Sequence, residues 1–379
     1  MTKMREISTL EVAAILKELN NINDLFIDKF YLISEDEFRF KLSKSGVKIN
    51  VQCKLCHNFS QTEYVKSVDN DSKSTFESAV RKRIGNFYIT GITQPNDDRI
   101  INLKIKKGDT EKNVIIEMFA KGNLIIANSD YKIELVYKPK TFKDRSIEIN
   151  EIYKPPEKSE ITISDLKGNE FIKKLIDIYK NSNQSIKLIK FLNKLINIGV
   201  IYIEDSIIQN KIDPNVKLSD VNENMLKSII LTIKEKVNYI DAPLPTLYFD
   251  NDDNPIDFSI CPISKYSDYK SKTFDRIGKM LDTLTYENDN SVDTPVSKKA
   301  KETEISIQKQ KEIIQSMHER IDYDKEAGKI IFTNMNLINQ VINFASSNKH
   351  LTLDQLKEQF PYLNIKEVDL VKKTITLEF

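Results

Sequence analysis

The sequence predicts an α+β fold, in which a mixed-sheet N-terminal domain is followed by a helical segment and a long coiled-coil helix. Between residues 25 and 137, short aromatic or β-branched runs alternate with turn residues, a pattern typical of half-buried strands. Between residues 160 and 240, apolar residues recur at helical spacing. From about residue 295 to 345 they recur every seven residues, as in a coiled coil.

Length and charge limit the class of protein. The 379 residues are enough for two or three domains. No apolar run approaches the ~18 residues of a membrane span, and charges interrupt the N-terminus where a signal peptide would be apolar. We therefore expect a cytoplasmic protein without membrane association. Because the net charge is only +1, a nucleic-acid partner would have to be bound by local patches.

The first elements are a helix and a hairpin. Ser8 or Thr9 can cap a helix that runs to about Leu19. Residues 25–42 alternate on both sides of a polar turn, which predicts a β-hairpin, and residues 46–51 predict another strand.

A further helix is predicted over residues 76–84, and its last turn carries the basic triplet Arg81, Lys82 and Arg83. These side chains can contact phosphate groups. A solvated helix end is the commoner meaning of such a triplet.

A hairpin over residues 84–105 is central to the first domain. Its second strand alternates from residue 99 to 105, and Gln94 to Asp98 is a turn sequence. Asp98 and Arg99 therefore lie where a loop re-enters a sheet. A fixed carboxylate beside a fixed guanidinium can contact a phosphate or a base edge. By spacing alone, a local ion pair at a strand end is the commoner arrangement.

The rest of the chain divides into four parts. A second hairpin and a short strand complete a first domain over residues 1–157. Amphipathic stretches predict a helical domain over 158–240, and mixed structure returns over 241–290. Residues 296–346 predict the coiled-coil helix. Residues 350–379 predict the start of a middle domain that we expect to be truncated.

The seven-residue spacing predicts a helix that needs a partner. The first seam consists of Ile307, Ile314, Ile321, Gly328, Met335 and Ile342. A long helix that is polar on its other sides is stable when its apolar stripe is covered. We therefore expect self-association through this seam.

Cysteine and histidine residues give little support for a cofactor, a metal or catalysis. The run Cys53 to His57 matches the c-type haem pattern, but the chain shows no export signal. A zinc site would need a further donor, and Cys261, His318 and His350 are the remaining candidates. We expect a reduced cysteine pair, no metal and no cofactor. With scattered histidines and no nucleotide-binding glycine motif, we predict no catalytic residue and no enzyme.

Five stretches, in order and spacing, resemble the NFACT family of ribosome-associated quality-control factors, which includes RqcH-like, NEMF-like and fibronectin-binding protein A-like proteins. They are Ser8–Glu11, Asp28–Tyr31, Gln94–Arg99, Glu117–Ile126 and Tyr153–Pro156. The chain departs from the family pattern at Glu11, where the family has Asp, and at Ala120, where it has Gly.

The resemblance implies a fold. It implies an N-terminal domain with a DNA-glycosylase-like fold, made discontinuous by an inserted helix-hairpin-helix domain, with residues 241–290 rejoining the first sheet. Of the glycine-rich turn in the insert, this chain keeps only Gly199. Thr2 and Lys3 stand where the glycosylases have Pro-Glu, so glycosylase activity is not expected.

The resemblance also implies a function. Such factors bind a large ribosomal subunit that still holds peptidyl-tRNA and recruit a tRNA, typically alanine tRNA, for mRNA-independent tailing of the stalled chain. In this reading Asp98, Arg99 and Glu11 bind the tRNA, and Arg81, Lys82 and Arg83 add phosphate contacts. The alternative is a coiled-coil protein-interaction scaffold that does not bind tRNA.

Overall fold

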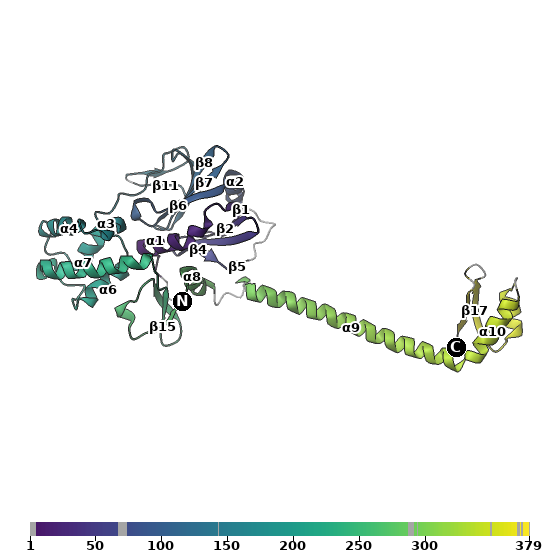
Figure 1. The fold of residues 1–379 in the computed structure, drawn as a ribbon. Helices are drawn as coiled ribbons and strands as arrows, with labels where there is room; N and C mark the ends of the chain where they lie inside the picture. Colours follow the sequence, from purple (N-terminus) through teal and green to yellow (C-terminus); the bar gives the residue numbers. More distant parts are fainter. Residues whose placement is uncertain are drawn as a thin grey trace. The chain divides into compact units, whose positions relative to one another are not determined.

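The computed structural model describes residues 5–66, 74–142, 144–286, 292–293, 295–348, 351–369, 372 and 374–378 (Figure 1). Thr2, Lys3 and His350 lie outside these residues. The chain forms two compact units, Met1–Pro295 and Val296–Phe379, and each has a hydrophobic core of its own.

A nine-stranded sheet is the frame of the first unit. Its order is β10-β9-β8-β7-β6-β1-β2-β3-β4. The strands are β1 (Phe26–Ser34), β2 (Glu37–Lys44), β3 (Val47–Lys54), β4 (Asn58–Thr62), β6 (Tyr88–Thr93), β7 (Ile100–Lys107), β8 (Thr110–Glu117), β9 (Asn123–Asn128) and β10 (Ile133–Val136). Every neighbouring pair is antiparallel. The prediction of a mixed sheet is therefore wrong, and the sheet is antiparallel. Short hairpins join most neighbours, and hairpins produce antiparallel pairing.

Both faces of this sheet are covered at β7 to β10. Ile101, Leu103 and Ile105 alternate into the main core, as their period of two predicts. On the opposite face, Ile100 packs in a smaller cluster with residues of β8, β9 and β10 and of the segment up to Tyr153. Helices α1 (Thr9–Glu18) and α2 (Thr75–Ile84) are packed against β4 and β1.

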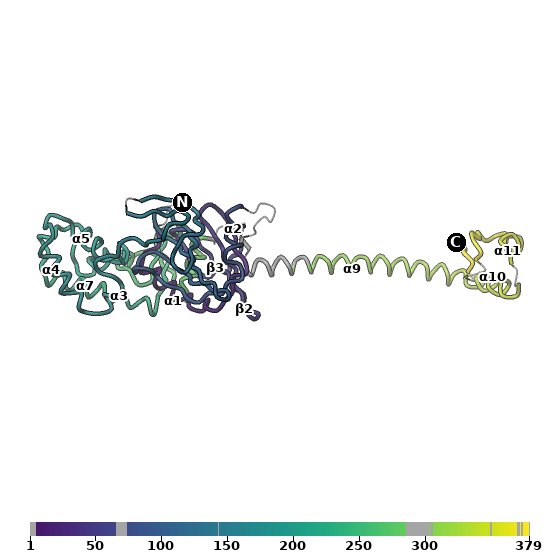
Figure 2. Tube along the Cα trace, turned by 90° about the horizontal axis from the view of Figure 1, so that it is seen from above, coloured from purple at the N-terminus to yellow at the C-terminus, as the bar shows by residue number. Residues whose placement is uncertain are grey.

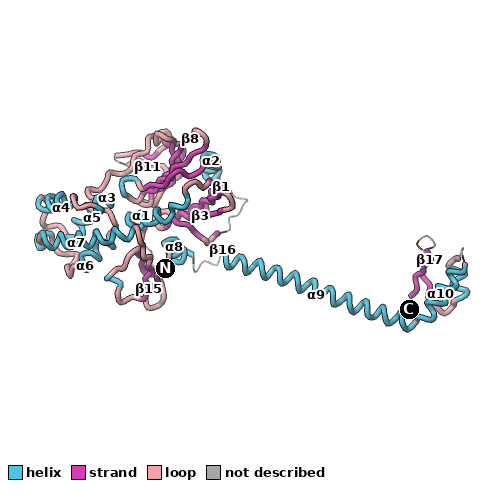
Figure 3. Tube along the Cα trace, in the orientation of Figure 1, coloured by secondary structure: helices cyan, strands magenta, loops and turns pink. Residues whose placement is uncertain are grey.

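Five helices gather at one end of the first unit (Figures 2 and 3). They are α3 (Ile163–Lys167), α4 (Phe171–Lys180), α5 (Leu188–Leu195), α6 (Val200–Gln209) and α7 (Glu223–Val237). Their apolar faces, with Tyr202 fully buried, continue the core of the sheet domain. A helical segment between two β-rich parts is therefore present, while its helix-hairpin-helix character stays a prediction.

Residues 241–286 form a small sheet of their own. The strands β13 (Thr246–Phe249), β14 (Pro255–Ser259) and β15 (Lys270–Thr273) pair only with one another among the described residues. The expectation that this segment rejoins the first sheet is wrong, because its strands form a separate sheet. Its connection is instead through α8 (Ile277–Tyr286), which packs on β4, and through the two-residue strands β5 (Val65–Lys66) and β16 (Val292–Asp293).

The second unit begins with a long helix. The expected helix over 296–346 is present as α9 (Pro295–Thr333) and α10 (Met335–Ser347). Asn334 interrupts it with a ψ of 15°, and its side-chain amide bonds the carbonyl of Ile330. The unit also contains α11 (Leu353–Gln359), β17 (Asn364–Asp369) and β18 (Thr374–Glu378). Pairing of α9 as a coiled coil stays a prediction.

Candidate nucleic-acid interface

The predicted site residues lie where the start of α1 meets the turn between β6 and β7. Ser8 caps α1: its hydroxyl accepts from the amide N–H of Glu11 at 3.3 Å, and its own N–H donates to the Glu11 carboxylate at 2.6 Å. This reciprocal pair is a capping box, which fixes the direction in which the chain enters the helix.

The turn before Asp98 is tied to two other parts of the chain. The Gln94 amide donates to the carbonyl of Thr9 at 3.0 Å, which joins the turn to α1. The Asp97 carboxylate accepts from the N–H and the hydroxyl of Ser164 at 3.0 and 2.8 Å, which joins it to α3. Asn96 and Asp97 both have positive φ, a conformation that Asn and Asp tolerate. The turn is therefore held in one conformation.

Asp98 is oriented by the helical domain. One oxygen of its carboxylate accepts from the N–H of Arg99 at 2.7 Å and from the side-chain amide of Asn197 at 2.9 Å. The Asn197 carbonyl oxygen accepts from the Thr9 hydroxyl at 3.1 Å. Asp98 is half-buried, and within the described parts of the chain no group donates to its second carboxylate oxygen, which remains able to accept a hydrogen bond.

Arg99 points to a different partner. Its guanidinium forms an ion pair with Glu6 at 2.6 Å and lies 5.9 Å from the centre of the Phe119 ring. The Arg99 side chain is 28% exposed and that of Glu6 is 44% exposed. Asp98 and Arg99 therefore do not pair with each other. The local ion pair that spacing alone favours is not formed.

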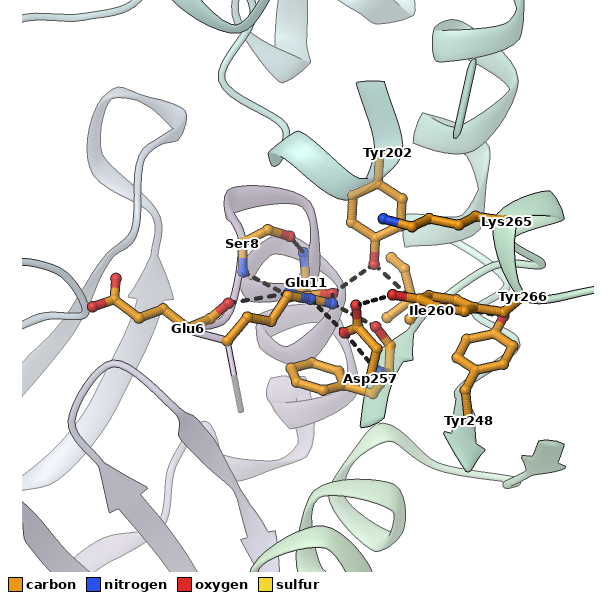
Figure 4. A network of polar contacts seen from close by, with 12 residues as sticks. Glu6, Ser8, Glu11, Tyr202, Tyr248, Asp257, Ile260, Lys265 and Tyr266 are labelled. Carbon is orange, nitrogen blue, oxygen red and sulfur yellow. Dashed lines mark hydrogen bonds and ion pairs between the residues drawn. The ribbon is translucent and has the colours of Figure 1, made fainter. Parts of the chain in front are cut away.

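Glu11 lies inside the protein (Figure 4). Its side chain is 1% exposed, and it accepts hydrogen bonds from the guanidinium of Arg5, the N–H of Ser8 and the hydroxyl of Tyr202. Burial on its own raises the pKa of a carboxyl group. Here the Arg5 charge and these hydrogen bonds outweigh burial and lower the pKa of Glu11.

The Glu11 network joins separate parts of the first unit. Arg5 also pairs with Asp257 of β14 at 2.7 Å, and Asp257 accepts from the Tyr266 hydroxyl at 2.8 Å. The Tyr202 oxygen accepts in turn from the N–H of Ile260 at 3.2 Å. The structure thus places Glu11 in a structural network instead of at the surface beside Asp98 and Arg99.

The basic triplet of α2 has mixed surroundings. Arg81 pairs with Glu77 at 2.7 Å and donates to the carbonyl of Phe30 at 2.7 Å. Arg83 donates to a carbonyl of its own helix at 3.1 Å. Lys82 is exposed. Of the three, Lys82 is the residue most accessible to a phosphate.

The cysteines are buried thiols. Cys53 is the next-to-last residue of β3, Cys56 lies in the following turn, and neither forms a disulfide. Burial raises the pKa of the Cys56 thiol to about 11, so it is protonated near neutral pH. The described residues contain no cluster of three or more metal-ligating side chains.

Several residues of this region were not predicted from the sequence. Glu6 and Asn197 contact Arg99 and Asp98, and Arg5, Tyr202 and Asp257 surround Glu11. No short motif connects Tyr202 with Glu11, which lies 191 residues away. Only the fold brings them together.

Comparison with known proteins identifies the family. The family model for the NFACT N-terminal and middle domains matches residues 8–359. The chain belongs to the NFACT family. The capping-box helix and the Gln94–Arg99 turn, on which the resemblance rested, lie within the matched region.

The relatives found are distant. The archaeal Rqc2 homolog aRqcH of Methanocaldococcus jannaschii is 20% identical over 376 residues, covering 96% of this chain and 54% of the relative. The human ribosome quality control complex subunit NEMF is 21% identical over 237 residues, covering 62% and 22%. The chain thus spans about half the length of the archaeal relative and less of the human one.

Solved structures support the fold. The fibrinogen binding protein from Staphylococcus aureus is similar with a TM-score of 0.57 and 18% identity, covering 74% of this chain and 98% of that one. Matched DNA glycosylases have TM-scores of 0.30 to 0.34, too low to support an argument, so the expected glycosylase-like fold stays a prediction. Among the described residues, no helix is long and apolar enough to span a bilayer.

Proposed function

We propose that this NFACT-family chain acts in ribosome quality control: it binds a large ribosomal subunit that holds peptidyl-tRNA and recruits a tRNA for mRNA-independent tailing. The names of its relatives support the general role. The observation that carries the tRNA proposal is the geometry of Asp98 and Arg99. Asn197 of the helical domain holds Asp98, and Glu6 holds Arg99. Both Asp98 and Arg99 keep polar groups available at the surface.

The two side chains can share the recognition of one unpaired nucleotide. The open Asp98 oxygen accepts a hydrogen bond from an exocyclic amino group of a base, and the Arg99 guanidinium binds a phosphate or a base edge through its planar N–H groups. Unpaired loop bases are the parts of an RNA that proteins read in this way. Glu11 acts as a positioning residue that fixes the start of α1, and Lys82 adds a phosphate contact.

The remaining assignments follow from the same proposal. The ribosome performs the peptidyl transfer, so the chain itself is not an enzyme and needs no cofactor. Alanine tRNA is the proposed cargo, and the cytoplasm is the proposed location.

The long helix of the second unit provides a separate means of association. Ile307, Ile314, Ile321 and Met335, spaced by sevens or multiples of seven, are each about half exposed. Covering such a stripe stabilises a helix. We propose that α9 pairs with another helix, including that of a second copy of this chain. A sedimentation measurement over a range of protein concentrations tests self-association.

Sequencing the RNA that co-purifies with the tagged chain tests the tRNA proposal. We would compare wild type with Asp98→Ala/Arg99→Ala and with Asp130→Ala/Lys132→Ala, which removes the same charges from an exposed turn. We expect one or a few tRNA species in the wild type and in the control, and none in the site variant. Equal tRNA recovery in all three, or recovery in none, contradicts the proposal and favours a protein-interaction scaffold.

A further inference from the structure

A groove of about 730 Å³ lies beside Arg99 on the first unit. Its lining includes Glu6, the partner of Arg99, and the turn residues 55–57. Two lysines, Lys121 and Lys138, also line it. Lys121 lies in the Glu117–Ile126 stretch on which the family resemblance rests, and Lys138 lies outside all five stretches; the resemblance assigns a nucleic-acid contact to neither lysine.

The floor of the groove is rigid because two tight turns interlock there. Cys56 has a φ of 69°, and Ala120, Lys121 and Gly122 have φ values of 50°, 73° and 67°. The backbone of Lys121 lies close enough to the Cys56 thiol to oppose the rise of its pKa. A Cβ on Gly122 would lie 2.5 Å from the Cβ of Leu55, so the turns touch too closely for any other residue there. The backbone position of Lys121 is therefore fixed.

Lys138 is fixed in a similar way. The side chain of Asn123, which is buried, accepts from the N–H of Lys138 at 2.9 Å and donates to its carbonyl at 2.7 Å. The Lys138 ammonium lies 5.2 Å from the centre of the Tyr137 ring. Neither this ammonium nor that of Lys121 has a carboxylate within ion-pair distance among the residues that the structure describes. Each can therefore bind an external anion.

Glu6 connects the groove to the Arg99 site. Glu6, Cys56 and Lys138 line the same groove. Besides burial, the charges of Glu6, Arg99 and Lys138 act on the pKa of the Cys56 thiol. The Glu6 carboxylate lies 2.6 Å from the Arg99 guanidinium, at the position that a phosphate oxygen would take. Figure 4 shows the Glu6 side chain directed away from the buried network around Glu11. Glu6 can therefore leave Arg99 without disturbing Glu11.

We infer that this groove is a second RNA subsite, in which Lys121 and Lys138 bind the phosphate backbone next to the nucleotide held by Asp98 and Arg99. The inference rests on the proposed function. Lysine ammonium groups bind phosphate as compact charges. Glu6 is the internal competitor: it holds Arg99 until a phosphate displaces it. Glu35 and Asp36 also line the groove, and their carboxylates oppose the binding of a phosphate next to them.

Fluorescence anisotropy with a labelled RNA stem-loop tests this subsite. Lys121→Gln/Lys138→Gln should weaken binding about tenfold and reduce the slope of log K against log salt by about 1.4, because each single-strand phosphate contact contributes about 0.7. The control Lys104→Gln/Lys132→Gln removes two exposed lysines outside the groove and should change neither. Glu6→Gln should strengthen binding about threefold, the size of an exposed ion pair.

The outcomes separate this inference from the proposed function. Unchanged binding by Lys121→Gln/Lys138→Gln, together with loss of binding by Arg99→Ala, overturns the subsite and keeps the proposed function. A wild-type chain that does not bind the RNA overturns both. Lys121→Arg/Lys138→Arg keeps the charges and should bind as wild type. If it fails like the Gln variant while circular dichroism shows a folded protein, charge is not the cause and the subsite is overturned.

Discussion

The side-chain amide of Asn197 donates a hydrogen bond of 2.9 Å to the carboxylate of Asp98, which lies 99 residues earlier in the chain. Asn197 also accepts from the hydroxyl of Thr9, so it bridges the candidate site and the start of α1. It lies in the loop after α5. The helical domain thereby sets the orientation of a side chain that belongs to the sheet domain.

We predict that Asn197→Ala weakens RNA binding about three- to tenfold. The variant removes a hydrogen bond to a charged group, an interaction of about 1.5 kcal/mol, and lets Asp98 rotate. Anisotropy with the stem-loop RNA measures the effect. The matched control is Asn181→Ala in the same domain, where the lost bond joins only one helix to itself. Equal RNA affinities of the Asn197→Ala and Asn181→Ala chains would show that Asn197 does not contribute to the site.

A second prediction concerns Glu11. Glu11→Gln should lower the free energy of unfolding by about 3 kcal/mol, because it leaves the charge of Arg5 without its buried partner. Tyr202→Phe, which removes one hydrogen bond to Glu11, should cost about 1 kcal/mol. Urea denaturation measures both. Glu35→Gln is the exposed control and should cost little. A Glu11→Gln chain as stable as the control would show that the network is dispensable.

The same carboxylate predicts a dependence on acid. Because folding lowers the pKa of Glu11, its charged form stabilises the native state above the unfolded pKa of about 4.3. This contribution is lost as the pH falls through the lower folded pKa. Wild-type stability should therefore decrease below about pH 4, and the difference between wild type and Glu11→Gln should narrow there. If the difference in unfolding free energy between wild type and Glu11→Gln is constant from about pH 7 to pH 3, the lowered pKa of Glu11 is contradicted.

The third prediction uses two glycines. Gly199 caps α6 with a φ of 111°, and a Cβ there would lie 2.5 Å from the Cβ of Ser8. Gly199→Ala should therefore destabilise the chain by about 2 kcal/mol and weaken RNA binding by displacing Asn197. Gly91→Ala is the control, since no atom lies within 4 Å of the Cβ it would add. Thermal unfolding and anisotropy of both variants give the comparison, and similar behaviour of the two would refute the close approach.

Local patterns explain which parts of this fold the sequence predicts well. The capping box of Ser8 and Glu11 and the hairpin around Asp98 are short-range features, and both are present. The period of two also identified the buried face of β7. In each case the residues that decide the structure are neighbours in sequence.

The less predictable parts depend on distant contacts. From the sequence, Glu11 is expected to bind tRNA at the surface. In the structure it is enclosed by Arg5, Tyr202 and the sheet of β13 to β15. The separate sheet of β13 to β15 and the packing of α8 on β4 both depend on residues distant in sequence, which no periodicity reveals. The heptad pattern has polar or glycine positions at Gln310, Asp324 and Gly328, but the helix breaks at Asn334 instead, because the pattern records apolar spacing and not backbone geometry.

The last prediction concerns Asp282, a buried residue of α8 at the end of β4. One of its carboxylate oxygens accepts from the N–H of Glu63 at 3.3 Å, and the other has no partner among the described residues. Burial raises the pKa of Asp282 to about 7, although the hydrogen bond from Glu63 and the charge of Arg276 oppose the shift. The unfolded value is about 3.9, so the native state holds an extra proton between about pH 4 and pH 7.

Stability should consequently fall as the pH rises through this window, because the charged carboxylate is favoured in the unfolded chain. Asp282→Asn removes the charge and should raise the free energy of unfolding by about 2 kcal/mol at pH 8, with little change at pH 4. Urea denaturation at the two pH values measures the difference. Asp268→Asn, at an exposed loop position, should show no such dependence. An Asp282→Asn variant that is less stable than wild type at pH 8 would mean that the carboxylate is charged and favourably bound in the native protein.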